Sequence, residues 1–387
     1  MPKPEKDAPY TGFEQGPIRP PSEARSLLVR VTRNCPWNRC TFCPVYKGAD
    51  FSLRPVDHVM ADIDSVCGHL AEIFRLAQEP SGLTQDGVNG LMERLAPGER
   101  PAFAAAINWY TSGMESIFLQ DANSLIIKPA DLVAILRHLK ERFPWVKRIT
   151  SYARSHSVAR ISDEDLAAIG GAGLNRIHIG MESGSDAVLS KVKKGVTKAE
   201  QVKAGQKVKK AGIELSEYVM PGLGGRELSR ENALETADAL NLINPDFIRL
   251  RTLAVPSSTP LFAELSSGAF TQATEVEVAE EILLFLENLK VTGTVLASDH
   301  ILNLFEDMEG VLPRDQPAMI ATVRRFLALD PEIRTLYQVG RRIGVFRGLS
   351  DMKNPDAAAR AKAMMERLSI TPENVDETIN RIMRSFV

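Results

Sequence analysis

Three of the four cysteines of the chain lie within nine residues, at Cys35, Cys40 and Cys43. A closed structural zinc site would need a fourth ligand, usually from a second pair, and neither His58 nor Cys67 forms such a pair. A plant-type [2Fe–2S] cluster has the same local spacing but also needs a distant fourth cysteine. Cys67 falls on the apolar face of a predicted helix, where cysteine is usually a small core residue. Three thiolates can instead hold three irons of a [4Fe–4S] cluster, leaving the fourth iron open as catalytic metal sites do.

The composition is that of an ordinary globular protein and excludes several classes. The chain has 387 residues, 44% of them hydrophobic, and a formal net charge of −2, which indicates no particular partner. No apolar run approaches the ~20 residues that span a bilayer, and the N-terminus lacks the apolar segment of a signal peptide. Four cysteines make no disulfide framework. We therefore expect a cytoplasmic protein that does not bind a membrane.

The elements that must position the cysteines follow an alternating pattern. Short β-branched runs alternate with amphipathic stretches, two of which begin with capping boxes at Ser162 and Thr197. The predicted strands are 27–32, 116–120, 147–153, 175–180, 213–220 and 246–254. The predicted helices include about 55–77, 128–143, 162–173 and 197–212. Six strands that alternate with helices indicate an α/β fold with a parallel βα-repeat sheet, open or closed.

Changes in this pattern set the expected domain boundaries. Residues 1–24 are Pro-rich and are predicted to form an extended N-terminal arm. The repeat core is expected at 25–260, with an insertion at about 78–112. The βα pattern fades after residue 256, so we expect a mostly helical C-terminal region at 261–387.

Charged side chains recur on one face of the predicted strands. Side chains alternate between the two faces of a strand, and the charged face here carries Arg30, Arg176, Arg249 and Arg251. A flat sheet with helices on both sides should be apolar on both faces. The pattern therefore favours a barrel whose lumen binds a polar, anionic molecule. Internal salt bridges would account for two or three of these charges equally well.

A cysteine triplet directly after the first strand of a six-fold βα core resembles the radical S-adenosylmethionine (SAM) superfamily. The resemblance covers residues 25–260 and is closest to the branch of oxygen-independent coproporphyrinogen oxidases, methylthiotransferases and the catalytic subunit of Elongator. It implies a partial (βα)6 TIM-like barrel and an oxygen-sensitive [4Fe–4S] cluster held by Cys35, Cys40 and Cys43. It also implies reductive cleavage of SAM to a 5′-deoxyadenosyl radical, which takes a hydrogen atom from the substrate. The common spacing is C-x3-C-x2-C, so the extra residue between Cys35 and Cys40 leaves the subfamily open.

The resemblance further implies where SAM binds, because the family places its ligands after the strands of the barrel. The expected cofactor-binding residues are Phe42, Gln120, Asp121, Asn123, Ser151, Arg154, Gly180, Glu182 and Arg251. Arg154 would pair with the SAM carboxylate, and Glu182 would bind the ribose or the amino group. The catalytic residue is unknown, and the candidates are Tyr218, His178 and His300. The segment with Asp299, His300 and Asn303 would either cap the barrel mouth or hold a turn.

The cysteine count narrows the activity. Methylthiotransferases bind a second cluster, and only Cys67 remains for one. We therefore expect a single-cluster enzyme with a small-molecule substrate and a reductase partner such as flavodoxin or ferredoxin. Two alternatives stay open: an iron–sulfur electron carrier without SAM chemistry, and a tRNA- or nucleic-acid-modifying radical enzyme. The second rests on eight lysines in 188–210, which a solvated lysine face would also explain.

Overall fold

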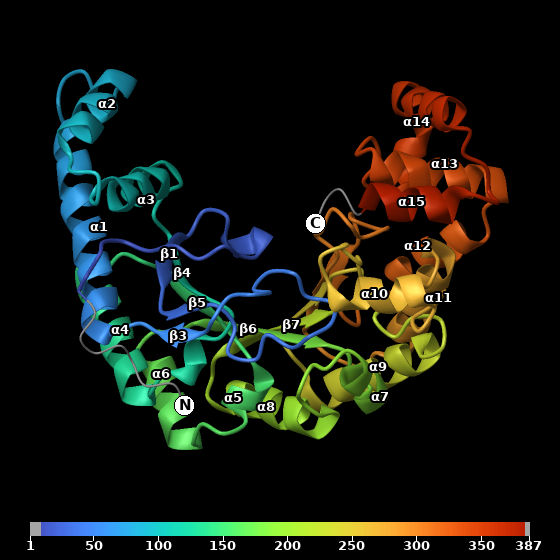
Figure 1. Cartoon of the computed structure of the whole chain (residues 1–387), viewed down its shortest axis with the longest axis horizontal. Helices are drawn as coiled ribbons and strands as arrows, with labels where there is room; N and C mark the ends of the chain where they lie inside the picture. Colours follow the sequence, from blue (N-terminus) through green and yellow to red (C-terminus); the bar gives the residue numbers. More distant parts are fainter. Residues whose placement is uncertain (1–8, 384–387) are drawn as a thin grey trace. The chain divides into compact units, whose positions relative to one another are not determined.

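Figure 1 shows the computed structural model, which describes residues 9–383 of the chain. The first eight residues of the predicted N-terminal arm lie outside the described part, as do residues 384–387. The strands are β1 (Leu27–Arg30), β2 (Thr32–Arg33), β3 (Ser52–Leu53), β4 (Ser116–Gln120), β5 (Arg148–Ala153), β6 (Arg176–Glu182), β7 (Glu214–Val219), β8 (Phe247–Leu250), β9 (Val295–Ala297) and β10 (Glu309–Val311).

The helices fill the intervals between these strands and most of the C-terminal part. The α-helices are α1 (Val56–Ala77), α2 (Gln85–Arg94), α3 (Arg100–Thr111), α4 (Pro129–Arg142), α5 (Ser155–Val158), α6 (Asp163–Gly171), α7 (Asp186–Lys191), α8 (Lys198–Lys210), α9 (Ser229–Ile243), α10 (Pro260–Ser267), α11 (Glu275–Asn288), α12 (Gln316–Leu327), α13 (Pro331–Arg342), α14 (Pro355–Leu368) and α15 (Val375–Met383). Short 3₁₀ helices are η1 (Pro21–Glu23), η2 (Ser124–Ile126) and η3 (Leu349–Lys353).

The main sheet has the strand order β1-β4-β5-β6-β7-β8-β9-β10, and β2 pairs with β3 in a separate two-stranded sheet. The pairs β1–β4, β4–β5, β7–β8 and β8–β9 are parallel, whereas β10 is antiparallel to β9. Helices follow each of β1, β4, β5, β6, β7 and β8 along the chain. The predicted α/β fold with βα repeats of the partial (βα)6 TIM-like type is therefore confirmed.

The predicted strands agree with the structure closely at their starts and less well at their ends. β4 covers the predicted residues 116–120. The predicted strand 27–32 is divided, because β1 ends at Arg30 and β2 begins at Thr32. β8 ends at Leu250, four residues before the predicted end. Its carboxyl end is therefore a loop, and Arg251 lies just outside the strand.

The chain divides into two compact units, and the first comprises residues up to 38, 45–178 and 207–214. This unit contains β1, β4 and β5 together with α1, α3, α4 and α6. Helices α1 and α3 contact β1, and α4 packs on α1 and on α6. Of the predicted apolar face of α1, Val59, Ile63, Val66 and Leu70 are buried, whereas Cys67 is only half-buried. Ile73 extends the buried face by one turn. The predicted insertion at 78–112 contains α2 and α3, and α3 packs on α1. The Trp109 ring of α3 lies edge-on to Phe143, with 5.0 Å between ring centroids.

The second unit comprises residues 39–44, 179–206 and those from 215 onward. Its helices α9, α11 and α12 pack in succession, and α13 packs on α14 and α15 (Figure 1). The apolar core of the last three helices is formed by Leu302, Val339, Ile370, Val375 and Ile379. The two short strands β9 and β10 also belong to the region expected to be mostly helical. Within residues 9–383, no helix combines the length and the apolar character needed to cross a membrane.

Candidate active site

The loop that carries the cysteines begins one residue after β2 and folds back on itself around Asn38. The Asn38 backbone has φ of 47°, a left-handed conformation that asparagine tolerates better than most residues. Its side-chain amide donates to the carbonyl oxygens of Tyr46 and Ala49. Its backbone N–H donates to Cys35 Sγ at 3.4 Å. Asn38 lies in the unusually long interval between Cys35 and Cys40, so it gives that interval a defined shape.

The other part of the loop, residues 39–44, belongs to the second unit and is held there by its backbone. The Thr41 N–H donates to the Val192 carbonyl at 2.9 Å, and the Thr41 carbonyl accepts from the Leu261 N–H at 3.0 Å. Thr41, which lies between Cys40 and Cys43 in the sequence, is buried. The Lys194 ammonium lies 5.9 Å from the centroid of the Phe42 ring. These contacts attach the loop to the end of α7 and the start of α10.

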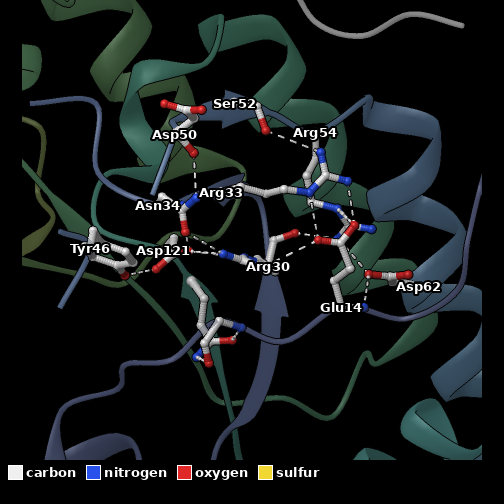
Figure 2. A network of polar contacts seen from close by, with 12 residues as sticks. Glu14, Arg30, Arg33, Asn34, Tyr46, Asp50, Ser52, Arg54, Asp62 and Asp121 are labelled. Atoms are coloured by element: carbon white, nitrogen blue, oxygen red, sulfur yellow. Dashed lines mark hydrogen bonds and ion pairs between the residues drawn. The ribbon is translucent and has the colours of Figure 1, made fainter. Parts of the chain in front are cut away.

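Asp121 connects the sheet to the first part of the loop (Figure 2). Its Oδ2 accepts from Arg30 Nε at 3.1 Å, from Arg30 Nη2 at 2.8 Å and from the Asn34 N–H at 3.0 Å. Its Oδ1 accepts from the Tyr46 hydroxyl. Asp121 is fully buried. The resemblance places Asp121 with SAM, whereas in this structure both of its oxygens bind protein donors on either side of the cysteines.

The described part of the N-terminal arm lies against this network. Glu14 accepts from Arg33 Nε at 2.8 Å and Nη2 at 2.5 Å, and Glu14 Oε1 lies 3.4 Å from Arg54 Nε. Arg54 also pairs with Asp62 at 2.7 Å, although burial dominates and raises the pKa of Asp62. Figure 2 shows these side chains on one side of Arg30.

Gln120, the residue before Asp121, is also committed to the arm. Its Oε1 accepts from the Gly16 N–H at 2.8 Å, and its Nε2 donates to the Ile18 carbonyl at 2.8 Å. Gln120 is buried. The backbone of the N-terminal arm is therefore hydrogen-bonded to both polar atoms of the Gln120 amide, which the resemblance assigns to SAM.

Asn123, Ser151 and Arg154 lie together at the ends of β4 and β5. Asn123 Oδ1 accepts from the Arg154 N–H at 3.1 Å, and Asn123 Nδ2 donates to Ser157 Oγ at 2.7 Å. Ser151 Oγ donates to the Tyr152 carbonyl at 3.0 Å. The Arg154 guanidinium lies 5.2 Å from the centroid of the Trp37 ring, which belongs to the cysteine loop. Arg154 is thus adjacent to the loop within the first unit, and Asn123 is hydrogen-bonded to Arg154.

His178 is buried in an aromatic and acidic setting. Its ring lies edge-on to Tyr152, with 5.9 Å between centroids, and its Nε2 lies 3.5 Å from Glu23 Oε1. Glu23 also accepts from Ser26 Oγ at 2.6 Å and from Arg148 Nη2 at 3.2 Å. Burial opposes ionisation of Glu23, but His178, Ser26 and Arg148 together lower its pKa. The structure places His178 beside a buried carboxylate that sequence reasoning did not identify.

In the second unit, two acids, Glu182 and Glu217, both interact electrostatically with Lys194. Glu182 Oε1 accepts from Lys194 Nζ at 2.9 Å, and the Glu182 backbone has φ of 64°. A Cβ on Gly180 would overlap Glu182 Oε1, so the glycine makes room for this carboxylate. Glu217 is completely buried nearby. Burial raises the pKa of Glu217 well above its usual range; Glu182 raises it further, and Lys194 only partly opposes this.

Sequence reasoning missed Lys194 and Glu217 for different reasons. Lys194 was one of eight lysines in a polar segment, and nothing in the spacing distinguished it. Glu217 is an acid within a strand that is otherwise buried, with the burial pattern of Leu215 to Val219 unbroken. A charged residue inside a buried strand is the signal that would have identified it.

Three charged residues cluster at the end of β8. Asp299 Oδ2 accepts from Arg249 Nη1 at 2.6 Å, and Asp299 Oδ1 accepts from Arg251 Nη1 at 2.9 Å. Burial opposes ionisation of Asp299, but Arg251 and Arg249 prevail and lower its pKa. The Arg251 guanidinium lies 4.9 Å from the centroid of the Tyr218 ring. Burial, reinforced by Arg251, lowers the pKa of His300 to about 4.

The segment around Asp299 is tied to β8 by Asn303. Asn303 Nδ2 donates to the Leu250 carbonyl at 2.9 Å, and Asn303 Oδ1 accepts from the Thr252 N–H at 2.9 Å. Asp299 and His300 therefore lie beside the charged end of the strand, and Asn303 has the turn-holding role.

The turn after β7 is held by a buried acid from α11. Glu281 accepts from the Gly222 N–H at 2.9 Å, from Asn232 Nδ2 at 2.8 Å and from Ser229 Oγ at 2.6 Å. Burial outweighs these hydrogen bonds and raises the pKa of Glu281 to about 7. This contact fixes the glycine-rich turn at 218–225 to α11.

Other predicted charges are paired within the fold. Arg176 Nη2 lies 2.7 Å from Glu214. The lysines of 188–210 form several pairs with acids: Lys191 with Glu227, Lys198 with Glu235 and Asp238, and Lys207 and Lys210 with Asp163. With Lys194, which pairs with Glu182, at least five of the eight lysines contact acids within the fold.

The donor atoms of the cysteine loop fit a metal cluster in their chemistry. No disulfide joins any of the four. Among residues 9–383, no group of three or more His, Cys, Asp or Glu side chains is already arranged around a metal position. The fit therefore rests on donor chemistry: three thiols occur in one loop, and a backbone N–H donates to the sulfur of Cys35. Such hydrogen bonds to sulfur are typical of iron–sulfur sites.

Comparisons with known proteins agree with this chemistry. The sequence model of the radical SAM superfamily matches residues 29–237, more than half of the chain. A comparison with curated proteins finds no match.

Several solved structures are similar to the chain at low sequence identity. Archaeal Elp3 from Methanocaldococcus infernus is 18% identical, with a TM-score of 0.39, over 47% of this chain and 48% of that one. The radical SAM methyltransferase TsrM from Kitasatospora setae is 15% identical, with a TM-score of 0.43, over 64% and 38%. Methylornithine synthase, PylB, is 14% identical, with a TM-score of 0.41, over 78% and 81%. The chain thus spans about half or less of the first two proteins.

Proposed function

Because the chain belongs to the radical SAM superfamily, we propose that Cys35, Cys40 and Cys43 are the thiolate ligands of its [4Fe–4S] cluster. The chain is a SAM-dependent radical enzyme, and its cofactors are this cluster and SAM. The observation that carries the assignment is the position of the three thiols, in the loop directly after the first strands of the matched region. Cys67 is a poor alternative, since burial raises the pKa of its thiol and disfavours the thiolate that binds iron.

The chain's own residues hold and surround the cofactors. When bound, the cluster would supply the electron for reductive cleavage of SAM to methionine and a 5′-deoxyadenosyl radical, and that radical would take a hydrogen atom from the substrate. We assign Phe42, Ser151, Arg154, Gly180 and Glu182 to SAM binding, in accordance with the family's pattern. Arg251, which the resemblance also places with SAM, is assigned to the substrate instead, because it shares Asp299 with Arg249. Asp121, Gln120 and Asn123 are assigned to positioning, because their polar atoms already bind the loop, the arm and the end of β5.

The substrate is proposed to be an anionic small molecule. Arg249 and Arg251 support this proposal, because a single carboxylate lies between them. Arg30 and Arg176 do not support an anionic substrate, since each forms an ion pair with an acid of its own unit. His178, Tyr218 and His300 remain the candidates for the catalytic residue. Electrons would come from a flavodoxin or ferredoxin in the cytoplasm.

Anaerobic reconstitution of the purified protein tests the cluster and the chemistry together. We expect the broad absorbance of a [4Fe–4S] cluster, about four irons per chain, and 5′-deoxyadenosine on addition of SAM and dithionite. Replacing Cys35, Cys40 or Cys43 with Ala should abolish the cluster, whereas Cys67→Ala should retain it. Loss of the cluster in Cys67→Ala would indicate four protein ligands and an electron carrier.

A further inference from the structure

We propose that the Arg249–Asp299–Arg251 cluster binds an oxyanion, a carboxylate or phosphate group, of the substrate. The inference rests on the proposed function, because it locates the charge-recognising part of the same site. Arg249 lies in β8 and Arg251 directly follows its end, and both guanidinium groups reach the same carboxylate of Asp299. In the register of the sheet, Arg249 lies beside Tyr218 of β7.

The cluster carries one uncompensated positive charge. Two guanidinium groups share the single carboxylate of Asp299, at 2.6 Å and 2.9 Å. His300 adds no charge near neutrality, since burial and Arg251 keep its pKa at about 4. Besides Asp299, Glu306 is the acid that acts on the pKa of His300, but Glu306 pairs with Arg341 at 2.9 Å and with Arg347 at 3.3 Å. The Tyr218 ring stabilises Arg251 without neutralising it.

The burial of the cluster makes this charge significant. The side chains of Arg249 and Arg251 are 9% and 13% exposed, and that of Asp299 is 34% exposed. A buried guanidinium normally finds acceptors for its donors. Arg249 Nε and Arg251 Nη2 are buried and have no hydrogen-bond acceptor among the described residues. Two unfilled donors on neighbouring guanidinium groups are suited to the oxygens of a carboxylate or a phosphate.

The other arginines of the polar strand faces provide an internal comparison. Arg30 contacts two acids, Asp121 at 2.8 Å and Glu14 at 3.7 Å. Arg176 contacts Glu214 at 2.7 Å. In both places the acids at least equal the arginines in number, so the charge is balanced within the fold. At the end of β8 the arginines exceed the acids, and a ligand anion would restore the balance.

The experiment measures binding of inorganic phosphate and acetate to the reconstituted holoenzyme without SAM, by calorimetry at constant ionic strength in chloride. We expect saturable binding that Arg249→Gln and Arg251→Gln each weaken at least tenfold. Asp299→Asn should tighten it severalfold, because it removes the competing carboxylate. Arg251→Lys should weaken it less than Arg251→Gln, since it keeps the charge. The surface variant Arg324→Gln makes the same charge change at an exposed pair with Glu287 and should bind as the wild type does.

Three results would overturn the proposal. Phosphate or acetate binding no stronger than that of chloride would show that no anion site exists. Equal phosphate binding by the wild type and both Gln variants, with matching melting temperatures in the absence of ligand, would show that the arginines do not form it. A parallel loss of SAM affinity in the Gln variants, with SAM displacing phosphate, would assign the cluster to the SAM carboxylate instead. Failure of the proposed function is distinguishable, because wild type would then bind phosphate but form no 5′-deoxyadenosine with SAM and dithionite.

Discussion

Arg30 binds Asp121 through two hydrogen bonds to one carboxylate oxygen, from Nε at 3.1 Å and Nη2 at 2.8 Å. The same carboxylate accepts from Asn34 and Tyr46, residues that precede the first cysteine and follow the third. A single buried side chain therefore sets the position of two points of the loop relative to β1 and β4. The loop is thus attached to the ends of β1 and β4 both before the first cysteine and after the third.

Asp121→Asn should destabilise the protein and lower its iron content. The substitution leaves the part-buried Arg30 charge with only the more distant carboxylate of Glu14, at 3.7 Å, which should cost about 3 kcal/mol in the free energy of unfolding. Tyr46→Phe removes one hydrogen bond and should cost about 1 kcal/mol. Chemical denaturation and iron per chain after identical reconstitution measure both effects.

The control for Asp121→Asn is Asp238→Asn, which breaks an exposed pair with Lys198 and should cost less than about 1 kcal/mol. If Asp121→Asn kept its stability and iron but lost SAM affinity, Asp121 would be a SAM ligand and the positioning role would be wrong.

Asn38 variants should separate the backbone requirement of the loop from its side-chain bonds. Asn38→Gly loses the bonds to Tyr46 and Ala49 but keeps easy access to the positive φ. Asn38→Ala loses both, and a left-handed alanine costs about 1 kcal/mol more. We expect iron to be lost to a chelator fastest from the Ala variant and slowest from the wild type. Equal rates in all three proteins would contradict the assigned role.

Gly180→Ala should weaken SAM binding. The new Cβ would overlap Glu182 Oε1 and lie 3.2 Å from Lys194 Nζ, so the ion pair must move. We expect at least a tenfold rise in the dissociation constant of SAM, measured by equilibrium dialysis. Gly68→Ala is the matched control, because it adds a methyl group to the exposed side of α1, where no atom lies within 4 Å. That variant should bind SAM normally and be slightly more stable.

Glu281 should make stability fall as the pH rises towards neutrality. Its pKa is about 7 in the folded protein and about 4.5 when unfolded, so the folded state holds a proton that the unfolded state releases between these values. Its contribution is therefore full below the unfolded pKa and is lost as the pH rises through the folded pKa, with a magnitude on the order of 3 kcal/mol.

Glu281→Gln removes this titration, so the stability difference between variant and wild type should change between pH 4.5 and 7. Denaturation curves at several pH values measure it. A constant difference across that range would show that Glu281 does not titrate there.

Local pattern was sufficient for the elements whose burial follows a simple period. β4 and α1 were predicted within a residue, because a fully buried five-residue strand and a regular apolar helix face are strong signals. β9 and β10 were not, since three residues carry too little pattern to separate a strand from a loop.

The site was predictable in its residue types and less so in its partners. The three cysteines, and the possibility that two or three of the strand-face arginines form internal salt bridges, followed from the sequence alone. That Asp121 binds Arg30 and Tyr46, or that Gln120 binds the arm, depends on contacts between residues up to 104 positions apart. Such contacts leave no spacing signal, because chain topology and not periodicity brings the residues together.

The left-handed turn at Asn38 has a consequence for how this loop varies among relatives. The longer interval between Cys35 and Cys40 contains this one residue with positive φ, and its side chain closes the loop on Tyr46 and Ala49. Relatives that share the longer spacing should therefore carry Asn, Asp or Gly at this position, whereas those with the shorter spacing are free of this restriction. The identity of one non-ligand residue would then serve as a marker for the lineage that acquired the insertion.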